Sequence, residues 1–374
     1  MKGTDVIMFF RKIERKGISM KHLTITVPCF NSEAYLERCV DSLVVGGEHV
    51  EIIIVNDGST DRTGEIADRY ARQFPDLVTV VHKQNGGHGS GVNAGLARAT
   101  GMYFKVVDSD DWLADNGIAM LLAGMKRYAE ADMILFDGYR NSAAKEQPWE
   151  HFAHSKRWRA GRKLHKLQRG VLYYPMDFPG SRVSLAAPWD KLYRREFLLR
   201  CGILFREQLQ VLDDMIFNME VLGKAGCAAY DKSRIYHYRY VEASITNKYQ
   251  ADRVTQDKKV WDYIEWYQTR QSAEAVWEAD ETEAFRQAYY CRIIRSFAIC
   301  CRIHFYHREN GKCFGGKQQY LKSVLGSRPY AEAFEKVRFG NLEWRLKALV
   351  LFVRCRLYSG VYLLHLAARV LSGG

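Results

Sequence analysis

The sequence predicts an α/β fold, a doubly wound sheet followed by a C-terminal helical accessory region. Two observations predict it. From Lys21 to about Phe136, short apolar runs typical of strands alternate with helical patterns over short connections. From about Asp252 onward, aromatic-rich helical patterns replace this alternation.

Each element of the first region has its own signal. The run HLTITVP ends at a proline, and Ser32 then stands where a helix N-cap is expected. EIIIVND is a continuous apolar run, typical of a strand covered on both faces. LVTVVH, YFKVVD and DMILFD supply three further strands, with a glycine-rich loop before YFKVVD. This alternation indicates a ligand site at the carboxyl ends of the strands.

Changes of pattern divide the chain into four expected regions. These are an N-terminal extension 1–20, a catalytic domain 21–248, a helical accessory region 249–340 and an amphipathic C-terminal tail 341–374. The catalytic domain carries a basic, aromatic-interleaved insertion at 141–175, which we interpret as a flap beside the active site. The first residues lack the long apolar core and cleavage site of a signal peptide.

Composition limits the partners. The formal net charge of +12 suits an anionic partner, either a nucleic acid, a phosphate-rich substrate or an anionic membrane. The nine cysteines have no paired spacing, which predicts reduced thiols in the cytosol. No uninterrupted stretch of 18 apolar residues is present, so we expect no ordinary membrane span.

Carboxylates follow two of the predicted strands directly. Asp57 follows EIIIVN, and Asp108, Asp110 and Asp111 follow YFKVV. Several carboxylates at one edge of a sheet repel one another, so they call for a cation or a shared proton. Hard oxygen ligands suit Mg²⁺ or Mn²⁺, which also bind diphosphates. The alternative is that Ser109 and the acidic residues merely cap the next helix.

Three segments resemble the signatures of family 2 glycosyltransferases. They are VPCFN at 27–31, VNDGSTD at 55–61 and VDSDD at 107–111, in the family's order and spacing. The resemblance covers Lys21 to about Ala129 and, more loosely, Pro188 to Thr246. It implies a Rossmann-like nucleotide-diphospho-sugar transferase fold with a mixed sheet. It also implies inverting transfer of a sugar from a nucleoside-diphosphate donor to an acceptor hydroxyl.

The resemblance also implies the roles of particular residues. Asp57 would accept a hydrogen bond from a uracil N–H, and Asp110 would bind Mn²⁺ or Mg²⁺ most directly. The donor-binding set is Pro28, Phe30, Asn31, Asp57, Asn85, Gly87, Asp108, Ser109, His237 and Arg239. The metal set is Asp108, Asp110 and Asp111, and the acceptor side is Trp189 and Lys191.

A base for the acceptor hydroxyl is expected in VLDDMIF. Asp213-Asp214 resembles the family's acidic pair, with Asp214 at the position of the base and Asp213 in place of the usual Glu. The alternative is plain N-terminal helix capping. Further on, YHYR at 236–239 and Ser244 to Thr246 resemble the family's closing segment, although a lone histidine on a strand is as often structural.

The glycine-rich loop from Gln84 to Gly95 would let backbone approach a ligand closely. It departs from the family at Val92, where an arginine is common, and His88 or Lys83 could supply the missing donor contact. The same loop contains Gly-x-Gly-x-x-Ala at 89–94, a match to a dinucleotide fingerprint that would make the protein an oxidoreductase. A dinucleotide fingerprint should directly follow its strand, but several residues separate this match from the strand LVTVVH.

The tail from Leu346 to Leu371 is apolar but interrupted by cationic residues. It suits the plane of an anionic membrane surface, or alternatively a helix packed on the accessory region. The membrane interpretation predicts a carbohydrate or lipid-linked acceptor in cell-surface polysaccharide or glycolipid synthesis, at the cytoplasmic face of the plasma membrane. The alternative of a nucleic-acid-binding protein finds no recognisable module, so we expect no nucleic-acid partner.

Overall fold

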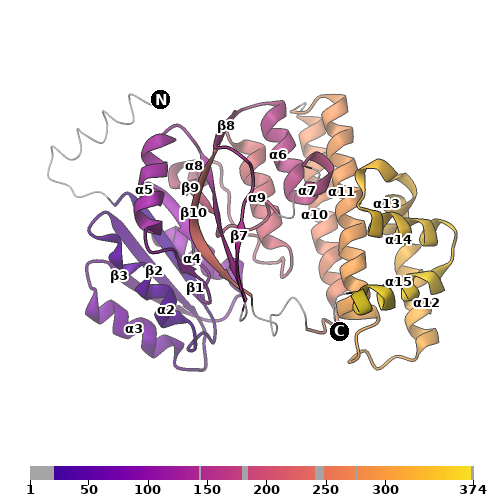
Figure 1. The fold of residues 1–374 in the computed structure, drawn as a ribbon, viewed down its shortest axis with the longest axis horizontal. Coiled ribbons are helices and arrows are strands. Elements are labelled where there is room, and N and C mark those ends of the chain that lie inside the picture. Colours follow the sequence, from indigo (N-terminus) through magenta and orange to yellow (C-terminus); the bar gives the residue numbers. More distant parts are fainter. Residues whose placement is uncertain (1–20, 143–144, 179–183, 241–247, 275, 372–374) are drawn as a thin grey trace. The chain divides into compact units, whose positions relative to one another are not determined.

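The computed structural model describes residues 21–142, 145–178, 184–240, 248–274 and 276–371. Unit 1 comprises the residues up to Gln168 together with Leu185–Tyr240, and unit 2 comprises Arg169–Ser184 with the residues after Tyr240 (Figure 1). The first unit thus ends eight residues earlier than the catalytic domain expected at 21–248, and it excludes 169–184. The extension 1–20 and the segment Ser244–Thr246 lie outside the described residues.

A mixed sheet forms the centre of unit 1, as the sequence predicts. Its strand order is β3-β2-β1-β4-β9-β6-β10-β5, with β7 paired to β6 and β8 paired to β10. Pairing is parallel among β1, β2, β3 and β4 and between β6 and β10, whereas β5, β7, β8 and β9 pair antiparallel. The strands are β1 (Leu23–Cys29), β2 (Val50–Asp57), β3 (Val78–Lys83), β4 (Tyr103–Val106), β5 (Trp112–Leu113), β6 (Met133–Asn141), β7 (Glu146–Trp149), β8 (Lys156–Arg159), β9 (Lys191–Arg194) and β10 (Cys227–Arg239).

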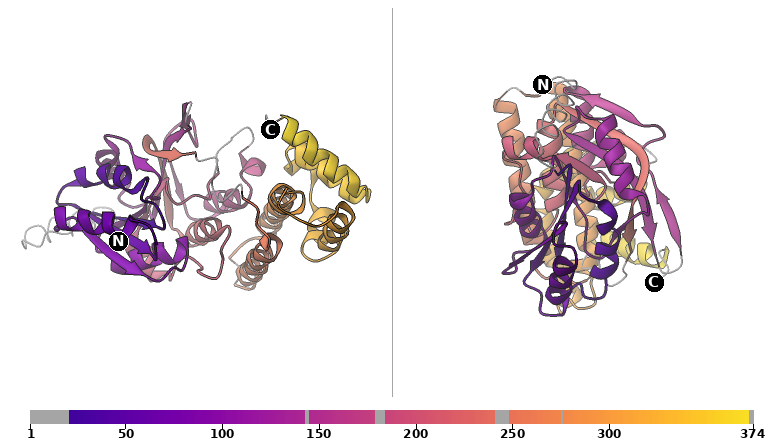
Figure 2. Two further views of the ribbon diagram at one scale, coloured as in Figure 1. Left: turned by 90° about the horizontal axis from the view of Figure 1, so that it is seen from below. Right: turned by 90° about the vertical axis from the view of Figure 1, so that its left-hand side faces the viewer.

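Helices cover both faces of this sheet (Figure 2). Helices α2 (Leu36–Asp41), α3 (Thr63–Gln73) and α5 (Gly117–Arg127) share one apolar core with alternate residues of β1. Helix α4 (His88–Arg98) packs on β1 and β2 from the other face, where Thr24 and Thr26 are fully buried. The short helix α8 (Arg195–Arg200) and the longer α9 (Asp213–Lys224) complete this unit.

The glycines of α4 explain its close approach to the sheet. A Cβ on Gly95 would lie 1.9 Å from Thr26 Oγ1, and one on Gly91 would lie 3.0 Å from Pro28 Cβ. These two glycines stand one helical turn apart and face β1. They serve helix–sheet packing rather than the close approach to a ligand that the sequence suggested.

The segment at 141–175 is not a separate flap. It supplies β7, β8 and helix α6 (Arg162–Leu172), and both strands join the central sheet. Its basic residues lie against aromatic rings, with Lys156 Nζ 4.3 Å from the Phe152 ring centre and the Arg157 guanidinium 4.7 Å from that of Tyr128. The interleaved basic and aromatic pattern therefore reflects side-chain packing within unit 1.

Unit 2 is helical. Its helices are α7 (Tyr174–Asp177), α10 (Arg253–Ala273), α11 (Ala279–Cys300), α12 (Phe314–Leu325), α13 (Tyr330–Lys336), α14 (Trp344–Arg354) and α15 (Tyr358–Leu371). The predicted tail forms α14 and α15, which pack on each other and on α11, α12 and α13. Within the described residues, no helix is both long and apolar enough to cross a bilayer.

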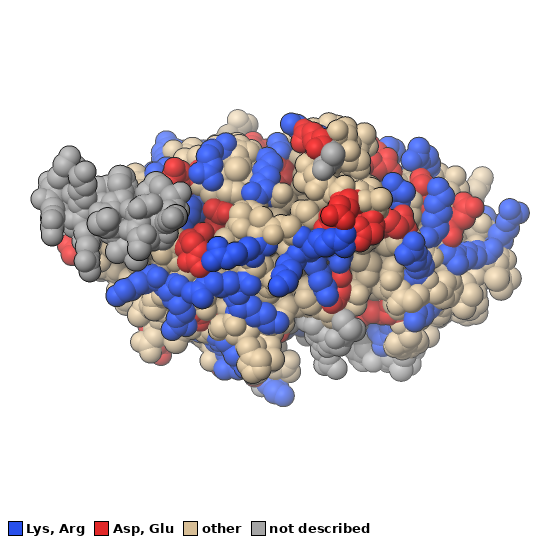
Figure 3. Space-filling view, turned by 90° about the horizontal axis from the view of Figure 1, so that it is seen from above, with Lys and Arg blue, Asp and Glu red and all other residues tan. Residues whose placement is uncertain are grey.

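All nine cysteines are free thiols, and two of them, Cys313 and Cys355 of unit 2, are exposed. Charge is also dispersed. On the face drawn in Figure 3, Lys and Arg side chains lie among Asp and Glu side chains.

Candidate active site

The loops after β1, β2 and β4 meet at the carboxyl edge of the sheet. The hydroxyls of Ser32 and Ser109 share a hydrogen bond of 2.7 Å, which joins the first and last of these loops. The side-chain oxygen of Asn31 accepts a 2.9 Å bond from the backbone N–H of Thr60, which joins the first and second. Asn31 itself has a left-handed backbone with φ 49°, a conformation that Asn tolerates. Beside it, Phe30 is half exposed, while Pro28 is buried in β1.

Asp57 holds the glycine-rich loop. Its carboxylate accepts backbone hydrogen bonds from Gly86 at 3.0 Å and Gly87 at 2.8 Å, and Lys83 Nζ lies 2.5 Å away. The side chain is therefore occupied within the protein, and a nucleotide base would have to share it. Gly87 has φ 85° and Asn85 is exposed, so the loop presents backbone and an amide at this edge.

Asp108, Asp110 and Asp111 follow β4, and their side chains have different surroundings. The Asp111 carboxylate is buried, accepting 2.7 Å bonds from the Tyr236 hydroxyl and the backbone N–H of Arg239. These contacts favour a structural role, tying β10 to the β4 loop, over that of a metal ligand. Asp110 is only partly buried, and none of the described residues donates a hydrogen bond to its carboxylate from a side chain. Burial, then the charge of Asp108, raises the pKa of Asp110.

His88 links two acidic groups that are far apart in the sequence. It is the first residue of α4, and its Nε2 lies 3.3 Å from Asp108 Oδ1. Its Nδ1 lies 3.6 Å from Asp213 Oδ2 and 3.7 Å from Asp214 Oδ1. Burial acts to lower the pKa of His88, but the hydrogen bonds to these carboxylates outweigh it and raise the pKa well above its usual value.

Asp213 and Asp214 open α9 behind a strained residue. Leu212, at the N-cap, has a left-handed backbone with φ 58°, which is rare for a branched side chain and recurs at functional sites. Asp214 Oδ1 is shielded from solvent and accepts no hydrogen bond from the described residues. Burial, followed by the charge of Asp213, raises the pKa of Asp214 to about 8. A carboxyl with such a pKa can both take up and release a proton near neutral pH.

Asn93 fixes the segment that leads to α9. Its side chain donates to the Phe205 carbonyl and accepts from the Phe205 N–H, both at 2.9 Å. The Phe205 ring in turn contacts the edge of His88, with ring centres 5.7 Å apart. Helix α4 therefore carries His88 and also Asn93, whose side-chain amide holds the segment before Asp213 and Asp214.

Arg239 lies beside Asp110. Its Nε donates a 2.8 Å bond to the Asp110 carbonyl oxygen, and its guanidinium lies about 5 Å from the ring centres of Tyr35 and Trp112. His237, predicted on the same strand, is instead stacked between Trp112 and Tyr139 at 4.9 and 4.7 Å. The geometry therefore favours Arg239 over His237 as a group that can contact a ligand.

Trp189 and Lys191, predicted on the acceptor side, are buried. Lys191 is fully inaccessible, and its ammonium lies 2.6 Å from Asp190 Oδ1. Asp190 Oδ2 in turn lies 2.8 Å from His151 Nε2. Trp189 is 6% exposed and stacks on Tyr236. Both side chains are therefore packed inside unit 1, where Trp189 and Lys191 support neighbouring residues of the site.

Two groups of side chains could hold a divalent cation. Asp108 and Asp110 offer the hard oxygen ligands expected from the sequence. In addition, His88, Asp213 and Asp214 offer one ligand atom each, all within 4.8 Å of one another. The two groups are joined by His88, so the charge of the whole edge depends on that imidazole.

Sequence reasoning missed three residues of this site. Tyr236 and Asn93 were not singled out, and the role of His88 was left open. Strand alternation in YHYR could have placed Tyr236 and Tyr238 on one face and His237 and Arg239 on the other. Nothing local in the sequence indicates that Asn93 bonds to a residue 112 positions later.

Comparisons with known proteins identify similar chains and folds. Residues 24–198 match the family described as glycosyl transferase family 2. The putative glycosyltransferase EpsH of Bacillus subtilis is 27% identical over 354 residues, 90% of this chain and 92% of that protein. GgaB of the same organism, a minor teichoic acid biosynthesis protein, is 35% identical over 96 residues, 25% of this chain and 11% of that one. The crystal structure of S. aureus TarS 1–349 in complex with UDP-GlcNAc superposes with a TM-score of 0.61, at 19% identity, over 93% of this chain and 91% of that one.

Proposed function

The chain belongs to glycosyltransferase family 2, and from that premise we propose that it uses a nucleotide sugar, transferring the sugar from a UDP-sugar with inversion at the anomeric carbon. One observation carries the proposal. The His88 imidazole lies between Asp108, 3.3 Å away, and Asp214, 3.7 Å away. Asp108 is suited to the donor side and Asp214 is suited to deprotonate an acceptor hydroxyl, and only the His88 side chain separates them.

The nucleotide would lie over the loops after β1, β2 and β3. Phe30, Asn31, Asn85 and Gly87 are the exposed groups there, and Asp57 orders the loop beneath them. UDP is favoured because the similar TarS structure was determined with UDP-GlcNAc. UDP-GlcNAc is therefore the first donor to test.

A divalent cation, Mn²⁺ or Mg²⁺, would be held by Asp108 and Asp110, where it would neutralise charge on the leaving diphosphate. The chain supports this role with Arg239, whose guanidinium is fixed by the Asp110 carbonyl oxygen and by two aromatic rings. Asp111 holds the same loop in place through Tyr236. The loop that carries Asp110 is therefore fixed by hydrogen bonds at the Asp110 carbonyl oxygen and at the neighbouring Asp111.

Asp214 would take the proton of the acceptor hydroxyl. Its pKa, raised by burial to about 8, matches a base that works near neutral pH. Direct attack by the deprotonated oxygen inverts the anomeric configuration, so no covalent sugar–enzyme intermediate is required. His88 and Lys191 both act on Asp214 through charge and keep its pKa from rising further.

We also propose that the acceptor belongs to a cell-surface polymer, free or lipid-linked, assembled at the cytoplasmic face of the plasma membrane. The likeness of one segment to GgaB, a minor teichoic acid biosynthesis protein, supports this acceptor class.

Donor hydrolysis and thermal stability test the proposal. We expect UDP-GlcNAc or another UDP-sugar to raise the melting temperature only with Mn²⁺ or Mg²⁺, and Asp110→Asn to abolish both this rise and metal-dependent hydrolysis. The matched control is Asp115→Asn, an exposed acid five residues on, which should behave as wild type. A folded wild-type protein that responds to no nucleotide sugar would refute the donor assignment.

A further inference from the structure

Unit 2 contains a pocket that the proposed reaction does not use. Its volume is about 410 Å³, and it opens between α12, the turn after α14 and the start of α15. Six of its lining residues define its chemistry, Lys322, Phe352, Arg356, Leu357, Tyr358 and Leu363.

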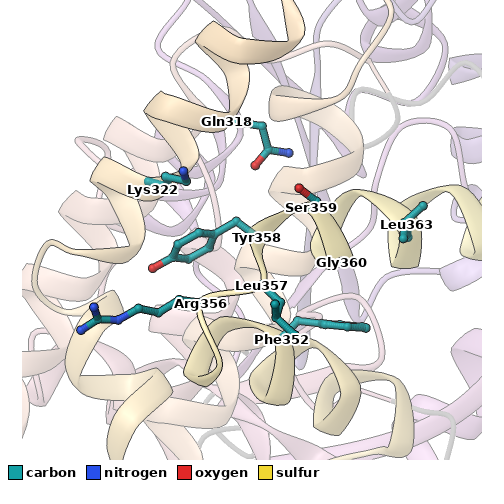
Figure 4. Close-up of a pocket in the computed structure, with 9 residues that line it drawn as sticks. All are labelled: Gln318, Lys322, Phe352, Arg356, Leu357, Tyr358, Ser359, Gly360 and Leu363. Carbon is teal, nitrogen blue, oxygen red and sulfur yellow. The ribbon is translucent and has the colours of Figure 1, made fainter.

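The two kinds of side chain are segregated around the pocket. Figure 4 shows Lys322, the Tyr358 hydroxyl and the Arg356 guanidinium on one side, and Phe352 and Leu363 on the other. A ligand that satisfies both sides has an anionic group beside an apolar part. Phosphate esters bind well to such cations, because lysine and arginine donate charge-assisted hydrogen bonds to phosphate oxygens.

Arg356 occupies a backbone position that usually belongs to glycine. Leu357 N–H bonds to the Phe352 carbonyl at 2.8 Å and Arg356 N–H to that of Val353 at 3.0 Å, which is the Schellman motif that ends a helix. Arg356 has φ 58° in this motif, a conformation that side chains other than glycine rarely adopt. The chain thus keeps a guanidinium where the fold would prefer no side chain.

The neighbouring Arg354 shows what a structural arginine looks like here. Its guanidinium donates to the carbonyl oxygens of Phe334, Glu335 and Val337 and closes the end of α13. Among the described residues, none accepts a hydrogen bond or ion pair from Arg356. Lys322 lies over the Tyr358 ring, with its Nζ 5.5 Å from the ring centre, and no described residue accepts a hydrogen bond from this Nζ.

Exposed apolar and cationic side chains also surround the pocket. Leu357 and Leu363 at its rim are 56% and 62% exposed. Residues 344–371 contain five Lys or Arg and no Asp or Glu. Exposed apolar side chains among cations, without acids, match the interface of an anionic bilayer.

We propose that this pocket binds the phosphate headgroup of an anionic membrane phospholipid. Lys322 and Arg356 pair with the phosphate, and Leu357 and Leu363 enter the acyl boundary. This site lies in unit 2 and needs neither the donor nor Asp214, so its test is independent of the glycosyl transfer. It specifies the tail's membrane contact at the level of individual side chains.

Vesicle binding by the full chain tests the proposal, with phosphatidylcholine vesicles with and without phosphatidylglycerol as probes. We expect binding only to the vesicles that contain phosphatidylglycerol. Since each Lys or Arg near an anionic surface contributes ~1 kcal/mol, Lys322→Gln with Arg356→Gly should lower the partition coefficient about thirtyfold. Glycine suits the backbone of position 356, so this variant should fold.

A matched variant separates a specific site from general charge. Arg72→Gln with Lys126→Gln removes two exposed cations from helices of unit 1, and we expect its vesicle binding to stay near wild type. Equal losses in the two double variants, or equal binding to both kinds of vesicle, would overturn the proposal.

The apolar side distinguishes a lipid from a soluble phosphate. Leu363→Ser should also weaken binding to anionic vesicles, because a headgroup anchored in a bilayer needs the apolar contact. If inorganic phosphate instead stabilises the wild type over the Lys322/Arg356 variant while vesicles bind both equally, the site takes a free phosphate and the lipid proposal fails.

Discussion

The carboxyl edge of the sheet and the turn between α14 and α15 use charged side chains in opposite ways. At the edge, Asp57, Asp111 and Lys191 are buried and bonded within the protein. At the turn, Arg356 is exposed and lines the pocket together with Lys322 of α12, beside exposed leucines. Loss of a charge at the edge should therefore change catalysis or folding, whereas loss of a charge at the turn should change only surface binding. Three predictions test the first half of this contrast and a fourth tests helix packing in the two units, from the largest effect to the smallest.

Asp214→Asn should lower kcat/KM for donor hydrolysis about 10³-fold, the range for loss of a general base. Asp214 is the second residue of α9, so Asn removes a favourable charge from the first turn, and a purely structural role predicts a small loss of stability and no such loss of activity. Steady-state kinetics with a nearly unchanged melting temperature would identify the base. Activity within tenfold of wild type would leave Asp214 with a structural role in the first turn of the helix.

Lys191→Met should lower the free energy of unfolding of unit 1 by about 3 kcal/mol, because it leaves the buried Asp190 carboxylate with His151 alone. Denaturant unfolding measures the loss. Lys126→Met, an exposed lysine on α5, is the control and should change stability by no more than about 0.5 kcal/mol. Equal stability of the two variants would contradict the contrast between buried and exposed charge.

Activity should rise with pH through the titration of Asp214. Burial raises the pKa of this carboxyl to about 8, so its basic form increases as the pH rises toward that value. Between pH 6 and pH 8, kcat/KM should increase about 50-fold if one deprotonation limits the reaction. The rising limb should vanish in Asp214→Asn, and a profile that falls over this range would exclude Asp214 as the base.

Gly95→Ala should destabilise unit 1 by about 2 kcal/mol, since its Cβ would overlap Thr26, whose Oγ1 lies 1.9 Å from the added atom. Gly315→Ala on α12 of unit 2 is the counterpart. No atom lies within 4 Å of that added Cβ, so the better helix propensity of Ala should raise stability by up to about 1 kcal/mol. Two shifts of the same sign in thermal unfolding would refute this account.

The sequence predicted those parts of the site whose position depends on residues adjacent in the chain. Strand ends that carry Asp57 and Asp108 follow directly from apolar runs closed by acids, and the structure places both at the carboxyl edge. The direction of Asp111 could not be predicted in this way. It is set by Tyr236, 125 positions later in the chain, through a hydrogen bond that no local pattern encodes.

The burial of charged side chains is a second feature that the sequence did not predict. The resemblance implied that Lys191 lies on the acceptor side, and lysine is almost never fully buried unless it is paired. Its partner Asp190 is adjacent, but the His151 that completes the group belongs to the weakly patterned segment at 141–175. The strands β7 and β8 of that segment pair with β6 and β10, and such pairing depends on contacts distant in sequence rather than on the pattern of the segment itself.

The exposed cysteines of this chain provide a site for attaching a fluorescent reporter. Cys313 and Cys355 are exposed in unit 2, whereas burial raises the pKa of Cys29 and Cys291 to about 12 and keeps their reactive thiolates scarce. Cys355 directly precedes Arg356 in the turn beside the pocket. With Cys313 and the partly exposed Cys201 replaced by serine, a maleimide fluorophore on Cys355 would sit next to the pocket, and its emission would shift on transfer from water to a bilayer.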